Sequence, residues 1–344
     1  MKGIVVHGVR DLRVTTLPEI EAAPDQIVVR IACGGICGSD LHYAADGCNG
    51  AYTVAEPLVL GHEVVGIVAE IGTDVTDAPP VGTPVAIHPA DPAAPAGASQ
   101  PTGLHLRADG TYLGSASTSP HTQGGFVERL AVRPGQLRVL PEDLPLSRAV
   151  LAEPLAVALH GVGRLGDRVA GARVLVSGAG PIGALTIAAL RHTGAAEVVA
   201  VDLQDFPLTT ATAVGATLAL NLSRGDALPD SSFDVVVEAA GATASLASIV
   251  DAVRPGGSVL QLGMLPSGPV PVPMSAIIAK ELALFGSQRF DVELDEAVAL
   301  LAAEPSLETV VSHRFALDDA AEAFEVAADS SRSSKVILQI SADS

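Results

Sequence analysis

Apolar and polar positions form short patches in the first part of the chain. Brief runs rich in valine and isoleucine are separated by glycine, proline and aspartate. Such runs, bounded by turn-forming residues, predict β-strands. We expect strands at residues 4–6, 12–16, 27–32, 64–71, 85–87 and 126–132. The chain up to residue 150 is therefore predicted to be rich in β-structure.

From residue 173 the pattern changes to strands that alternate with helices. Expected strands are 173–177, 198–202, 218–221, 233–238 and 258–263, and expected helices are 182–192, 206–214 and 245–253. This alternation predicts a parallel sheet with helices on both faces. The apolar run 174–190 contains Pro181 and three glycines, so it predicts a buried strand, a tight turn and a helix rather than a membrane span.

The last part of the chain returns to a mixed pattern. Expected helices are 294–302 and 320–328, and expected strands are 310–315 and 335–340. A chain of 344 residues is long for one hydrophobic core, so two domains are expected. The predicted fold class is α/β, with a doubly wound parallel sheet inserted between two pieces of a β-rich domain.

The composition fits a folded chain and excludes some partners. Hydrophobic residues make up 48% and charged residues 17%, which is enough apolar material for packed interiors. The net charge of −19 argues against nucleic acid or an anionic membrane as a partner, because phosphate binding needs a basic surface. The three cysteines are too few for a disulfide framework, which predicts a reducing compartment, the cytoplasm.

A glycine-rich turn follows the expected strand 173–177. The motif G-x-G-x-x-G opens the next expected helix, and Asp202 ends the following strand. In this context the glycines let the backbone approach a pyrophosphate, and Asp202 accepts hydrogen bonds from the ribose hydroxyls. Leu203 follows Asp202 in place of a basic residue, which favours NAD over NADP; the alternative is a turn that binds nothing. The expected cofactor-binding residues are Gly178, Gly180, Pro181, Ile182, Gly183 and Asp202.

Two separate segments offer metal ligands. The segment 34–40 contains Cys37, and the segment 61–66 contains His62 and Glu63. A thiolate, an imidazole and a carboxylate together suit zinc, and a catalytic zinc ion needs three protein ligands with one position left open. The alternative is that Cys37 is a buried apolar thiol and His62 a hydrogen-bonded core imidazole.

These motifs occur in the order found in one enzyme family. The likeness is carried by 37–43 (CGSDLHY), 61–66 (GHEVVG), 152–156 (AEPLA) and the dinucleotide motif. The chain resembles the zinc-containing medium-chain alcohol dehydrogenases over essentially its whole length, and 286–290 (GSQRF) is similar to their polyol branch. The resemblance implies a GroES-like catalytic domain, made of residues 1–152 and 290–344, and a Rossmann-type NAD-binding domain, 153–289.

The resemblance also implies a zinc site. Its ligands would be Cys37, His62 and either Glu63 or Glu153, and both carboxylates remain candidates. Many members of the family hold a second, structural zinc ion with four closely spaced cysteines. The corresponding stretch here, 89–107, contains no cysteine, which excludes a tetrathiolate site and predicts one zinc ion per chain.

Further site residues are implied in the same way. Ser39 and His42 would relay the hydroxyl proton to solvent, or else Ser39 caps the next turn and His42 is a surface residue. Tyr43, Glu153 and Arg289 would contact the substrate. A guanidinium suits a sugar acid because it holds a carboxylate in two hydrogen bonds; the alternative is that Arg289 pairs with an acidic side chain.

The implied activity is hydride transfer from a secondary alcohol to NAD. The expected substrate is a polyol or sugar acid, with L-idonate oxidised at C5 as the specific expectation. A cyclitol, an amino sugar or a threonine-like substrate is one alternative, and a dinucleotide-binding protein that has lost catalysis is another. A homo-oligomer, either a tetramer or a dimer, is also implied by the resemblance.

Overall fold

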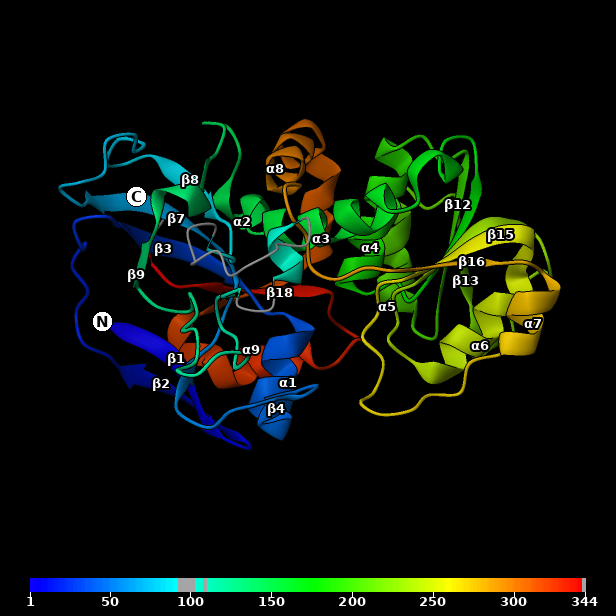
Figure 1. The fold of residues 1–344 in the computed structure, drawn as a ribbon, viewed down its shortest axis with the longest axis horizontal. Coiled ribbons are helices and arrows are strands. Elements are labelled where there is room, and N and C mark those ends of the chain that lie inside the picture. The colour runs from blue at the N-terminus through cyan, green and yellow to red at the C-terminus, as the bar shows by residue number, and fades with distance from the viewer. Residues whose placement is uncertain (92–102, 108–109, 342–344) are drawn as a thin grey trace.

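The computed structural model of the chain describes residues 1–91, 103–107 and 110–341. Two bodies, each built on its own sheet, lie side by side along the long axis of the molecule (Figure 1). The body with both chain ends is mainly β-structure, and the other is a sheet with helices packed on it (Figure 1). Among the described residues, no helix has the length and apolar character needed to cross a membrane.

The first body contains a seven-stranded sheet and a smaller three-stranded sheet. In the larger sheet the central strands β3 (Ile27–Gly35) and β7 (Glu63–Ile71) are antiparallel. They are flanked by β10 (Leu137–Val139), β8 (Pro84–Ile87), β9 (Arg129–Val132), β18 (Lys335–Gln339) and β17 (Val311–Ala316). The smaller sheet is formed by β2 (Asp11–Thr16), β1 (Lys2–Gly8) and β6 (Leu58–Val59). Strand β18, late in the chain, pairs with β3, which comes early, so distant parts of the chain share one sheet.

Short elements complete this body. Helix α1 (Gly38–Asp46) follows β3 directly, and the hairpin of β4 (Cys48–Asn49) and β5 (Tyr52–Thr53) comes next. The other helices here are α2 (Leu146–Ala149) and α9 (Ala320–Ala327). Helix α1 thus begins just after the central strand β3 ends. Its first turn therefore lies at the carboxyl end of that strand.

The second body is a six-stranded parallel sheet. Its order is β13 (Leu218–Asn221), β12 (Glu197–Asp202), β11 (Arg173–Ser177), β14 (Phe233–Glu238), β15 (Val253–Gln261) and β16 (Ala283–Gly286). Its helices are α4 (Pro181–His192), α5 (Asp205–Ala213), α6 (Thr243–Ala252) and α7 (Met274–Ala279). The strand order reverses beside β11, and in doubly wound sheets the crevice at that point binds nucleotides.

Helices α3 (Ala152–Gly163) and α8 (Leu294–Ala303) join the two bodies near the middle of the molecule (Figure 1). One hydrophobic core runs from Cys33 and Val65 of the first sheet through Leu155 of α3 to Val174 and Leu185 of the second body. The seven-stranded sheet and the six-stranded sheet are therefore packed together through α3. The predicted domain boundaries after residues 152 and 289 stay predictions.

Most sequence-based expectations for the second body agree with the structure. Strands 173–177, 218–221 and 233–238 have the expected bounds, and the run 174–190 is a strand, a turn and a helix. The expected strand 258–263 instead begins at Val253, and β9 is shorter than the expected strand 126–132. Helices α3 and α7 and strand β16 were not predicted. The cysteine-free stretch 89–107 lies largely outside the described residues.

Candidate metal and nucleotide site

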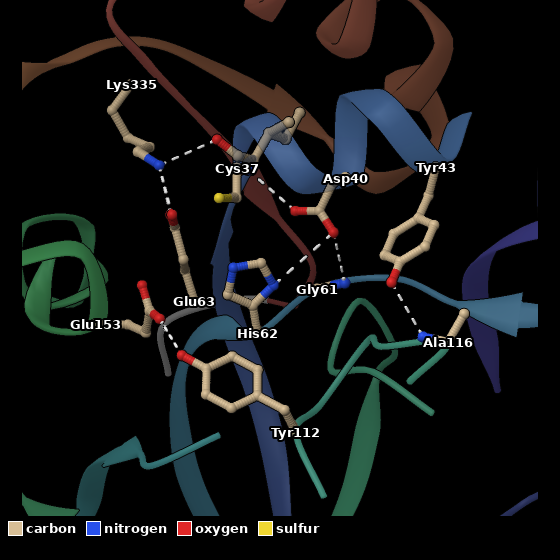
Figure 2. A network of polar contacts seen from close by, with 11 residues as sticks. Cys37, Asp40, Tyr43, Gly61, His62, Glu63, Tyr112, Ala116, Glu153 and Lys335 are labelled. Atoms are coloured by element: carbon tan, nitrogen blue, oxygen red, sulfur yellow. Dashed lines mark hydrogen bonds and ion pairs between the residues drawn. The ribbon is translucent and has the colours of Figure 1, made fainter. Parts of the chain in front are cut away.

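Cys37, His62 and Glu63 meet at the end of the central strands. Cys37 is the N-cap of α1, and the antiparallel register of β3 and β7 sets Glu63 opposite Gly35. One ligand atom from each of the three side chains lies within 4.8 Å of the others. Across residues 1–91, 103–107 and 110–341 this is the one group of three or more such side chains that could hold a metal ion. The predicted ligands therefore converge (Figure 2).

Asp40 ties the two ligand segments together. Its carboxylate accepts hydrogen bonds from the backbone amides of Cys37 (3.0 Å) and Gly61 (3.2 Å), and Oδ1 lies 4.0 Å from His62 Nδ1 (Figure 2). Asp40 is fully buried. A carboxylate beside a metal-binding histidine orients the ring and raises its basicity. Asp40 was not predicted as a site residue, although it belongs to the same motif as Cys37.

Lys335 forms a buried ion pair with Glu63. Its Nζ donates to Oε1 (2.6 Å) and Oε2 (2.7 Å) of Glu63 and to the carbonyl of Ile36 (3.0 Å) (Figure 2). Burial disfavours the charge on Lys335, but Glu63, with Cys37 and Glu153 nearby, outweighs it and raises the pKa of the lysine. Sequence reasoning missed this residue, because nothing in its neighbourhood distinguishes it from any first residue of a strand.

Glu153 approaches the group from the start of α3. Its Oε1 accepts a 2.5 Å hydrogen bond from the hydroxyl of Tyr112, whose ring centroid lies 5.7 Å from that of His62 (Figure 2). Burial raises the pKa of Glu153, and the neighbouring His62 opposes that rise. Of the two carboxylates that the sequence left open, Glu63 belongs to the three-residue group and Glu153 does not.

The donor set fits a divalent cation. One sulfur, one imidazole nitrogen and one carboxylate oxygen are the ligand types that zinc takes. The surroundings are rich in acidic groups: burial opposes a charge on His62, but Cys37, Asp40 and Glu153 outweigh it and raise the pKa of His62 to about 10. The same acidic surroundings favour a bound cation, so the residues present suit zinc.

The other predicted residues of α1 lie in different environments. Ser39 is half-buried in the first turn, where the capping box is formed by Cys37 and Asp40 and not by Ser39. His42 is exposed, with Nδ1 3.2 Å from Asp46 Oδ2. Tyr43 is 2% exposed, and its hydroxyl oxygen accepts a hydrogen bond from the Ala116 amide (3.1 Å). Their functional roles stay predictions.

Arg289 lies on Tyr112. Its guanidinium carbon is 3.9 Å from the centroid of the tyrosine ring. The backbone of Arg289 has φ of +50°, a left-handed conformation that side chains rarely adopt. Arg289, Tyr112 and Glu153 thus form a continuous row. The row ends beside the metal group, which is the set Cys37, His62 and Glu63. Tyr112 carried no motif signal and was not predicted.

The glycine-rich turn has the shape that a pyrophosphate requires. Gly178 has φ of +91°, and a Cβ there would come within 2.5 Å of the Ala240 amide nitrogen. A Cβ on Gly183 would collide with the carbonyl oxygen of Gly178. By contrast, no atom of another residue lies within 4 Å of a Cβ built on Gly180, which caps α4. The backbone is therefore closely packed at Gly178 and Gly183, while the space at Gly180, beside the N-terminus of α4, is open. An open helix N-terminus favours the binding of an anion.

The remaining nucleotide residues border this turn. Pro181 and Ile182 form the first turn of α4. Asp202 ends β12 beside the glycines, where its Oδ2 accepts from the Ala179 amide (2.8 Å) and its Oδ1 from the Leu203 amide (2.7 Å). All the predicted cofactor-binding residues therefore gather at one edge of the sheet, at the point where the strand order reverses.

Comparison with known proteins identifies related chains. Family models described as "Alcohol dehydrogenase GroES-like domain" and "Zinc-binding dehydrogenase" match residues 23–142 and 181–303. L-idonate 5-dehydrogenase (NAD(P)(+)) of Escherichia coli is 34% identical and is matched over 97% of both chains. Sorbitol dehydrogenase of Bacillus subtilis is 30% identical over 94% of this chain and 93% of its own.

The fold agrees as well. The crystal structure of L-idonate 5-dehydrogenase from Escherichia coli superposes with a TM-score of 0.91, at 33% identity and over 98% of both chains. The similarity thus extends over essentially the whole chain. The chain belongs to the zinc-containing medium-chain alcohol dehydrogenases, in their polyol branch.

Proposed function

We propose that this chain oxidises a secondary alcohol of a polyol or sugar acid and transfers the hydride to NAD, with L-idonate oxidised at C5 as the specific substrate. The observation that carries the proposal is the convergence of Cys37, His62 and Glu63 within 4.8 Å of one another. Helix α3 supports it, because it brings Glu153 to this group and packs against α4, whose N-terminus forms the nucleotide turn.

The residues that would hold the two cofactors are distinct. Cys37, His62 and Glu63 would hold one zinc ion, and the glycine turn with Asp202 would hold NAD. When bound, zinc supplies a Lewis acid for a substrate hydroxyl and NAD supplies the hydride acceptor. Asp202 favours the unphosphorylated ribose because its carboxylate would repel a 2′-phosphate.

The chain's own residues would bind the alcohol and move its proton. Glu153, held by Tyr112, orients the hydroxyl from the α3 side. Ser39 takes the proton and His42 releases it to solvent; the two are three residues apart on α1 and so share one face of the helix. The exposed ring of His42, in contact with Asp46, suits the outer position of this relay.

Arg289 supports a sugar acid as the substrate. Within the described part of the chain it forms no ion pair with a carboxylate, and its one notable contact is the face of Tyr112. A stacked guanidinium keeps its N–H groups available for bidentate binding of a carboxylate. This arrangement favours carboxylate binding over the alternative of a structural partner.

A substrate screen tests the proposal. Purified protein with one equivalent of zinc is mixed with NAD or NADP and with a series of polyols, aldonates, cyclitols and amino alcohols, and NAD(P)H absorbance is followed. Turnover of L-idonate with NAD, and its loss after chelation, is the expected result. If another substrate is turned over faster, that substrate would replace L-idonate in the proposal. No turnover with any alcohol would favour a nucleotide-binding protein without catalysis.

Two further measurements test the remaining predictions. Metal analysis tests the predicted single zinc ion, and light scattering tests the predicted homo-oligomer.

A further inference from the structure

Tyr112 connects Glu153 and Arg289, two residues that come from different parts of the chain. Its hydroxyl donates to Glu153 Oε1 at 2.5 Å, and the guanidinium carbon of Arg289 lies 3.9 Å from its ring centroid. The tyrosine is only 5% exposed, and its ring centroid is 5.7 Å from that of His62. One side chain therefore touches the residue that would bind a carboxylate and the residue that would orient a hydroxyl.

The hydroxyl of Tyr112 restrains Glu153. The Glu153 side chain is buried, so the direction of its carboxylate depends on the few donors around it. A phenol that donates to one oxygen selects a single rotamer and leaves the second oxygen to face other groups. A phenylalanine at this position would fill the same space without that restraint.

The ring of Tyr112 restrains Arg289. Long, charged side chains lose considerable conformational entropy when they are fixed, and a cation–π contact offsets part of that loss. Arg289 also has a left-handed backbone, at φ +50°, an uncommon conformation that the surrounding structure must hold in place. An aliphatic residue at position 112 would remove the surface on which the guanidinium rests.

We propose that Tyr112 is a positioning residue that couples carboxylate recognition by Arg289 to the alignment of Glu153 beside the metal group. Tyr112 is thereby a determinant of specificity for acidic sugars. This inference rests on the proposed function, because it needs one substrate that has both a carboxylate and a reacting hydroxyl. Arg289 would bind the carboxylate, and Glu153 would orient the hydroxyl.

Two substitutions separate the two contacts. Tyr112→Phe keeps the ring and removes the hydroxyl, so kcat should fall about tenfold for an aldonate and for a neutral polyol, with little change in KM. Tyr112→Leu also removes the ring, so KM should rise about tenfold for the aldonate alone. Tyr52→Phe is the matched control, because Tyr52 is exposed on β5.

A double-mutant cycle identifies the partner of the hydroxyl. Glu153→Ala, which removes the acceptor, should abolish most of the additional effect of Tyr112→Phe, because the two side chains act through one hydrogen bond. Independent effects would overturn the positioning role. Should Tyr112→Leu fail to fold, as judged by its thermal unfolding, the ultraviolet spectrum of Tyr112 described next tests the ring contact in its place.

A spectroscopic measurement separates this inference from the proposed reaction. The chain has three tyrosines and no tryptophan, so the ultraviolet spectrum of wild type minus Tyr112→Phe isolates the Tyr112 band. Added L-idonate should shift this band in the zinc-loaded protein, and a neutral polyol should shift it less. A shift without any turnover would refute the proposed reaction but retain the binding role of Tyr112. Turnover with no shift, and with both Tyr112 variants behaving like Tyr52→Phe, would overturn the inference.

Discussion

Lys335 and Glu63 form an ion pair behind the metal group, although 272 positions separate them in the chain. The lysine Nζ lies 2.6 Å and 2.7 Å from the two carboxylate oxygens, and the side chains are 3% and 1% exposed. Removing one partner of such a pair leaves an uncompensated buried charge, which is strongly destabilising. Glu63 therefore depends on a nearby cation, which Lys335 supplies and to which a bound zinc ion would add.

The first prediction concerns the charge of Glu63, which Lys335 neutralises and a bound zinc ion would also neutralise. Lys335→Met should destabilise the metal-free protein by about 3–5 kcal/mol and the zinc-loaded protein by clearly less, because zinc also neutralises Glu63. The measurement is the urea midpoint with chelator and with zinc. Lys2→Met, which breaks the exposed pair with Asp318, is the control and should move neither midpoint much. Equal losses in both conditions would contradict the role assigned to Glu63.

The second prediction concerns Asp40. Asp40→Asn keeps one oxygen acceptor but loses the charge beside His62 Nδ1, so zinc affinity should fall about 10- to 100-fold. Competition with a chromophoric chelator measures the change. Asp46→Asn, at the exposed end of the same helix, should leave the zinc affinity as it is. An unchanged affinity in Asp40→Asn would limit Asp40 to holding the backbone.

The third prediction uses two glycines of one turn. Gly183→Ala should lower the thermal midpoint, because its Cβ would meet the Gly178 carbonyl oxygen. Gly180→Ala has open space for its methyl group and should fold normally, yet bind NAD more weakly, because that space is where the pyrophosphate would lie. Calorimetric unfolding and NAD titration separate the two effects. Normal NAD binding by Gly180→Ala would place the cofactor elsewhere.

The nucleotide-binding half could be predicted from sequence because its signals are local. The glycines, the strand before them and Asp202 lie within 30 residues, and each has a pattern with a physical cause. Helix α3 was not predicted, because ten of its twelve residues are buried and few polar positions mark a solvent-exposed face.

The metal site could be predicted only in part. Cys37 and His62 were identified by their chemistry and by the motifs around them, which the resemblance made specific. Lys335 and Tyr112 carry no such signal, because each acquires its role from a contact that folding makes, 272 and 41 positions away along the chain. The choice between Glu63 and Glu153 depends on the same distant contacts.

The fourth prediction concerns substrate charge. Arg289→Ala should raise KM for an aldonate about tenfold or more and leave KM for a neutral polyol nearly unchanged, because a guanidinium–carboxylate pair is available only to the acid. Steady-state kinetics with L-idonate and sorbitol measure the ratio. Arg168→Ala, which removes a cation–π contact with Phe285, is a control of the same residue type. Equal increases for both substrates would remove the argument for a carboxylate.

The fifth prediction is a pH dependence at the junction of α3 and α8. Burial opposes ionisation of Glu293, but His160, at 2.7 Å, and the amide of Asp291 outweigh it and lower the pKa of Glu293 to about 2. A lowered carboxyl pKa stabilises the folded state at pH values above the unfolded pKa of about 4.5, and this contribution is lost as the pH falls towards 2.

Glu293→Gln should therefore lower the free energy of unfolding by roughly 2 kcal/mol at pH 7, and the difference from wild type should shrink below pH 4. Urea midpoints at both pH values, with exposed Glu296→Gln as the control, measure this, and a gap that stays constant down to pH 3 would mean that the charge of Glu293 contributes nothing.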